Sequence, residues 1–137
     1  MLSSLNNFLN RFRDFGILLL RLGIGTMFLF HGWPLISGGP EKWQFLGKAM
    51  QNLGINFGFT FWGFMAAFSE FGGAILLIFG FLFRPAAFLL LITMIVATVF
   101  HFHKGDPFSV ASHAIELGIV FLSLIFIGPG KYSVDKN

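Results

Sequence analysis

Four long apolar stretches fill most of this 137-residue chain, and they leave it few folds to adopt. A helix of about 20 apolar residues crosses the roughly 30 Å of hydrocarbon in a bilayer, and each stretch is close to that length. No segment alternates apolar and polar residues as the strands of a membrane β-barrel do. The sequence therefore predicts an all-α, integral membrane four-helix bundle that forms a single domain over residues 1–137. Its spans are expected at about 15–36, 59–83, 85–102 and 108–127.

The composition excludes a soluble domain. Hydrophobic residues make up 55% of the chain and charged residues only 11%, whereas soluble domains carry about 25% charged residues. The net charge of +3 suits anionic lipid headgroups, and no basic patch with interleaved aromatics suggests nucleic acid. The chain has no cysteine, which excludes disulfides, iron–sulfur ligation and thiolate zinc sites. Any sulfur chemistry would need a partner subunit.

Two shorter segments outside the spans have helical periodicity. In residues 1–14, apolar side chains such as Leu5 and Phe8 recur every three or four positions, which predicts an amphipathic anchor in the membrane interface. The first loop has Pro40 at a helix start and Gly54 after its last apolar residue, which predicts a second interfacial helix. This helix is expected to be either a passive cap or a lid over a site.

The basic residues outside the spans predict the orientation in the bacterial inner membrane. If the spans alternate, one side holds five basic residues and the other holds three. The positive-inside rule then places both termini in the cytoplasm. The five are Arg11, Arg13, Arg84, Lys131 and Lys136, and the three are Lys42, Lys48 and Lys104.

Ionisable residues inside the spans are the candidate site, because charge within a bilayer is costly and marks function. A rise of about 1.5 Å per residue places most of them in the outer half of the membrane. We expect a polar ligand cavity there, with Arg21 reaching up to fix Glu70. The alternative is that Glu70 only packs between helices, either protonated in the low-dielectric interior or neutralised by Arg21. The predicted cavity residues are Arg21, His31, Glu70, His113 and Glu116, with His101 as a further candidate.

The same residues do not form a known catalytic or metal motif. His113 and Glu116 share a helix face, where the carboxylate can orient the ring or both can bind a metal. A di-iron bundle needs two Glu-x-x-His motifs, and this chain has one His-x-x-Glu in reversed order, so no metal site is expected. His31 with His101 or His113 is the pair to consider for haem, but we expect histidines near the interface to hydrogen-bond water and headgroups. No catalytic residue is assigned.

Three motifs in order give the chain a resemblance to the DoxX family of small four-span membrane proteins, over about residues 15–135. Similar proteins often have Lys where this chain has Leu35, so no cation role is expected there. The motifs are Leu18-Leu19-Leu20-Arg21-Leu22-Gly23 leading to His31-Gly32, then Glu70-Phe71-Gly72-Gly73 with Gly80 and Arg84, and then Gly128-Pro129-Gly130-Lys131-Tyr132-Ser133 with Asp135.

The resemblance implies a link to quinone-dependent oxidation, since named members include subunits of quinol oxidase and of thiosulfate:quinone oxidoreductase. We therefore expect an inner-membrane protein that binds quinone or supports another subunit of a redox complex. A non-catalytic scaffold or assembly subunit and a small-solute transporter are the alternatives. Expected partners are the lipid bilayer, redox-complex subunits and a second copy of the chain, because small-residue helix faces favour association.

Overall fold

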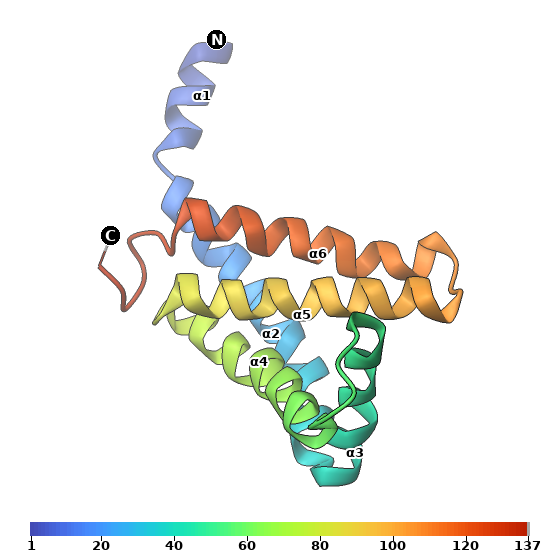
Figure 1. The fold of residues 1–137 in the computed structure, drawn as a ribbon. Helices are drawn as coiled ribbons and strands as arrows, with labels where there is room; N and C mark the ends of the chain where they lie inside the picture. The colour runs from blue at the N-terminus through green and yellow to red at the C-terminus, as the bar shows by residue number, and fades with distance from the viewer. Residues whose placement is uncertain (137) are drawn as a thin grey trace.

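The computed structural model describes residues 1–136, and every regular element in that range is helical. The elements are α1 (Leu2–Asn10), α2 (Arg13–Ser37), α3 (Gly39–Gly47), the 3-10 helix η1 (Lys48–Leu53), α4 (Phe59–Phe79), α5 (Phe83–Lys104) and α6 (Phe108–Ile127). This confirms the all-α, four-span fold, together with the N-terminal helix and the helix in the first loop (Figure 1).

The four long helices lie close to the predicted spans, with one difference at the end of the second. α4 ends at Phe79, whereas the apolar pattern runs on to residue 83. The backbone leaves the helix at Gly80, which has φ 66°, and Leu82 also has a positive φ of 46°. Left-handed φ values end a helix, so residues 80–82 form a tight turn into α5 although their side chains are apolar.

α4 lies at the centre of the bundle. It packs against α2, α3 and α5, while α6 packs mainly against α5. From their shared turn, α4 and α5 diverge, and the first-loop segment made of α3 and η1 lies between their far ends (Figure 1). The rings of Phe28 in α2 and Phe121 in α6 meet edge to face in the core, with centroids 5.3 Å apart, and so bring α2 and α6 into contact.

The first-loop segment packs on α4 through backbone contacts that only glycine permits. A Cβ atom at Gly47 would collide with the backbone of Phe59, and one at Gly63 would collide with the backbone of Trp43. The Trp43 indole also donates a 3.0 Å hydrogen bond to the Leu35 carbonyl at the end of α2. The segment is therefore packed closely on α4 and tied to the end of α2.

Candidate functional site

Arg21 is the most buried charged residue described, with 1% of its surface exposed, and it bonds four backbone carbonyls. Nε donates to Leu77 O at 2.9 Å, and Nη2 donates to Ile78 O at 2.7 Å. Nη1 donates to Pro129 O at 3.1 Å and to Tyr132 O at 2.6 Å. The predicted contact between Arg21 and Glu70 is wrong, because the guanidinium bonds carbonyls at the C-terminal end of α4 and in the tail, seven or more residues beyond Glu70.

This arrangement has a local cause at the turn between α4 and α5. The last carbonyls of a helix lack partners within the helix, and cations are favoured there. Arg21 satisfies two of those carbonyls in α4, and the Asp135 carboxylate accepts bonds from Leu82 N at 3.0 Å and Phe83 N at 2.9 Å at the start of α5. The C-terminal tail is thus held against the turn, and we call Arg21, Asp135 and the bonds they make the tail clamp.

Glu70 faces a cavity of about 400 Å³ between the first-loop segment, α4 and α5. Lys48, Gln51 and Asn52 from the first loop line the same cavity, so a carboxyl group shares it with an ammonium group and two amides. The remaining walls are apolar apart from the Thr93 hydroxyl group, and that hydroxyl already donates to Leu89 O of its own helix at 2.9 Å. Those walls comprise Phe45, Leu46, Ala49, Ala66, Thr93, Val96, Ala97 and Phe100.

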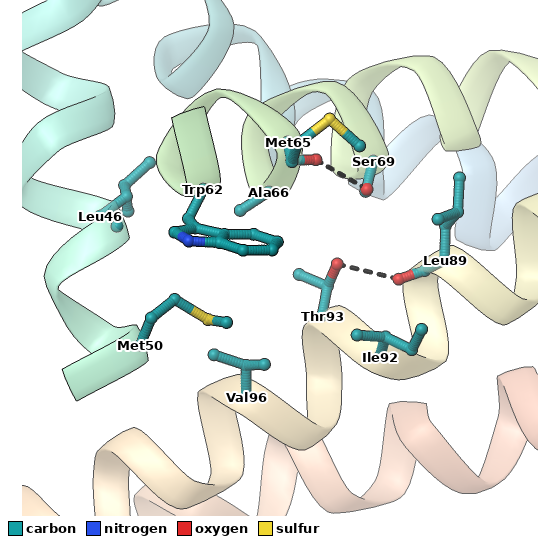
Figure 2. A pocket seen from close by; sticks show the side chains of 11 residues that line it. Leu46, Met50, Trp62, Met65, Ala66, Ser69, Leu89, Ile92, Thr93 and Val96 are labelled. Carbon is teal, nitrogen blue, oxygen red and sulfur yellow. Dashed lines mark hydrogen bonds between the residues drawn. The ribbon is translucent and has the colours of Figure 1, made fainter. Parts of the chain in front are cut away.

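A second, apolar compartment of about 230 Å³ adjoins this cavity, since Leu46, Ala66, Thr93 and Val96 line both. The Trp62 ring lies across this second compartment, between the first-loop segment and α5 (Figure 2). Its Nε1 atom is buried and has no hydrogen-bond partner within residues 1–136. A buried donor without a partner is costly, and a ligand oxygen would relieve that cost. We call the two compartments together the Glu70 groove.

The structure does not bring the other predicted residues to Glu70. His31, His113 and Glu116 are exposed on the outside of the bundle and do not line the Glu70 cavity. His101 instead pairs with Asp106, with 2.7 Å between Nδ1 and Oδ2, in the turn between α5 and α6. His113 and Glu116 lie on α6, and α5 stands between α6 and the groove. Within residues 1–136 no group of three His, Asp or Glu side chains is placed to hold a metal ion.

Sequence reasoning missed Lys48, Gln51, Asn52 and Trp62 as site residues. The periodicity of the first loop predicts an interfacial helix, and polar residues in such a helix ordinarily face water or headgroups. The available signal was Gly47 and Gly63, because glycines at helix contacts permit close backbone approach. Close approach of this kind places the polar side of η1 along the cavity that Glu70 also lines.

Comparison with known proteins gives two matches. The DoxX family model matches residues 16–104. The chain is also 31% identical, over 134 residues, to the protein named Inner membrane protein YqjF of Escherichia coli (strain K12), an alignment that covers 93% of this chain and 95% of that protein. No solved structure matches the chain significantly.

Proposed function

We propose that this chain, which belongs to the DoxX family of inner membrane proteins, binds a quinone head group in the Glu70 groove. The observation that carries the proposal is that Glu70, Lys48, Gln51 and Asn52 line one cavity whose other walls are almost entirely apolar. Ligand sites are mostly apolar cavities of about 300–1,000 Å³ with a few convergent polar groups, and this cavity of about 400 Å³ fits that description.

The polar groups match the two states of a quinone. The carbonyl oxygens of the oxidised ring accept hydrogen bonds, which the Lys48 ammonium and the amides of Gln51 and Asn52 can donate. The hydroxyl groups of the reduced ring donate hydrogen bonds, which the Glu70 carboxylate can accept. A carboxyl group beside the ring can also take up or release the proton that accompanies reduction.

The apolar compartment suits the rest of such a ligand. Leu46, Met50, Ile92 and Val96 offer hydrocarbon surface to a prenyl chain, and the free Trp62 N–H offers one further donor to an oxygen. The chain has no cysteine and no motif for a redox centre, so the electrons of a bound quinone would come from or pass to another protein. We therefore propose an accessory, quinone-binding subunit of a redox complex.

The basic residues support one orientation. Arg11, Arg13, Arg84, Lys131 and Lys136 lie at the end of the bundle that holds both termini, and we propose that this end faces the cytoplasm. The Glu70 groove then opens within the outer half of the membrane, beneath the first loop.

The test is quinone binding by the protein purified in mild detergent. Extraction of co-purified lipids, followed by mass spectrometry, is expected to yield quinone from the unmodified chain. Glu70→Gln keeps the shape of the side chain but loses the charge, and it is expected to lower quinone affinity by about tenfold, as loss of a charge-assisted hydrogen bond does. Tryptophan quenching by an added short-chain quinone measures that affinity.

Glu116→Gln is the matched control, because Glu116 is also a carboxyl group within a span but lies outside the groove. Its quinone affinity is expected to equal that of the unmodified chain. If the unmodified chain neither carries nor binds quinone, or if both variants lose affinity equally, the proposal is rejected. Unchanged activity of a co-purifying redox partner with Glu70→Gln would then favour the scaffold function.

A further inference from the structure

The outward face of α6 carries a stripe of polar side chains where a lipid-facing helix would be apolar. Ser109, His113, Glu116 and Ser123 are all exposed, and their spacing of four, three and seven residues keeps them on one helical face. We call these four residues the α6 stripe. They lie within the Phe108–Ile127 span, and Glu116 is more than two turns inside its first residue.

The rest of the bundle does not cover this stripe. The buried residues of α6 lie on its opposite face, toward α5 and the core, and they are Ala111, Ala114, Gly118, Phe121 and Leu124. α6 forms one edge of the bundle, with α5 on its inner side (Figure 1). The stripe therefore faces lipid in a single copy of the chain.

The stripe holds two groups that need partners. Ser123 is satisfied by its own helix, since its hydroxyl donates to Ile119 O at 2.8 Å. His113 and Glu116 are three residues apart but do not pair with each other, because the ion pair found within residues 1–136 joins His101 and Asp106. A carboxyl group and an imidazole facing hydrocarbon are costly, and such groups pair with polar groups on a neighbouring helix.

We propose that the α6 stripe is the interface of a homodimer, in which α6 of one copy packs in parallel against α6 of a second copy. A two-fold axis along the membrane normal brings each residue to the depth of its own counterpart. His113 and Glu116 differ in depth by about 4.5 Å, so each His113 lies within reach of the partner's Glu116, and the pair forms twice.

The choice of a second copy rests on this self-complementarity. A two-fold interface requires one face to present both members of every pair, and the α6 stripe presents an acid and a base one turn apart. The small Ser109 and Ser123 at the two ends of the stripe allow the backbones to approach closely. A face with only acids or only bases would instead require a different partner.

Disulfide crosslinking in native membranes tests the dimer. Because the chain has no native cysteine, a single-cysteine variant can form a disulfide only at the introduced position. Ser123→Cys is expected to form a covalent dimer of twice the monomer mass on mild oxidation. Leu19→Cys is the matched control, because Leu19 is exposed near the same end of the bundle but lies on α2. It is expected to remain monomeric.

The ion pair is tested by exchanging its members. In the Ser123→Cys background, His113→Glu or Glu116→His alone is expected to lower the dimer yield about tenfold. The double variant restores both pairs with reversed partners, and it is expected to recover the dimer. Equal crosslinking of Ser123→Cys and Leu19→Cys, or a Ser123→Cys adduct only with a different protein, would overturn the proposal. The proposal would also be overturned by a double variant that folds, as shown by its detergent elution profile, but does not recover the yield of crosslinked dimer.

Discussion

Arg21 and Asp135 lie on opposite sides of the turn between α4 and α5 and complete the two helices that meet there. Arg21 donates to Leu77 O and Ile78 O at the end of α4, and Asp135 accepts from Leu82 N and Phe83 N at the start of α5. Each charge has the sign that its helix terminus favours. Two residues 114 positions apart in the sequence thus fix one end of the bundle.

Replacing Arg21 is expected to unfold the bundle at that end. Arg21→Met keeps an apolar stem of similar length but leaves the Ile78, Pro129 and Tyr132 carbonyls without their donor, while Leu77 O keeps the N–H of Gly80, so we expect a loss of about 3 kcal/mol or more in the free energy of unfolding. Arg21→Lys is expected to recover part of this loss, because an ammonium cannot reach all four acceptors as a planar guanidinium does. Denaturation in mixed micelles measures both.

Arg13→Gln is the control for Arg21, since Arg13 is exposed at the start of α2. It is expected to change the free energy of unfolding by less than about 0.5 kcal/mol. A stability of Arg21→Met equal to that of Arg13→Gln would show that the tail clamp contributes nothing.

Removing the Asp135 carboxylate is expected to release the tail. Leu82 is the one residue other than glycine with a positive φ within residues 1–136, and its N–H is held by Asp135. Asp135→Ala is expected to lose about 1–2 kcal/mol of unfolding free energy, and Asp135→Asn less, because asparagine also caps helices. Faster proteolysis after Lys131 in Asp135→Ala would report the release directly, and equal cleavage rates would contradict it.

Filling the contact between α3 and α4 is expected to open the Glu70 groove. Gly63→Ala places a methyl group against the backbone of Trp43, which cannot move without moving α3. We expect a loss of about 1–3 kcal/mol of unfolding free energy, as overpacking gives, together with weaker ligand binding. Gly23→Ala is the control, because nothing lies within 4 Å of its Cβ position, and it is expected to be neutral or slightly stabilising. Identical behaviour of the two variants would be inconsistent with the close contact.

Replacing Trp43 or Trp62 by phenylalanine is expected to change the free energy of unfolding by different amounts. Trp62 Nε1 is buried without a partner within residues 1–136, so Trp62→Phe removes a costly donor along with some packing, and we expect a change within about 1 kcal/mol. Trp43→Phe also removes the bond to Leu35 O, and it is expected to lose about 1 kcal/mol more. Thermal unfolding of the two ligand-free variants gives the comparison, and a greater loss for Trp62→Phe would refute the assignment of a free donor.

Residues 1–14 and the first loop show how far periodicity alone can be taken. Helical spacing predicted both segments as helices, and both are helical as α1 and as α3 with η1. The same spacing could not show that Lys48 of η1 lines a cavity together with Glu70. That placement depends on the close approach of Gly47 and Gly63 to backbone far away in the sequence.

The sequence alone determined the membrane location, the number of spans and the helical class, because these depend on the hydropathy of contiguous residues, which is a local property. It also identified Arg21 and Glu70 as candidate site residues, because charged side chains within a membrane span are costly. Only the tertiary structure decided their partners, because depth along a helix follows from the sequence whereas the direction of a side chain around the bundle depends on how helices cross. Because α4 and α5 diverge, Glu70 lines a groove together with residues of the first loop. The C-terminal tail supplies two of the four carbonyls that Arg21 bonds.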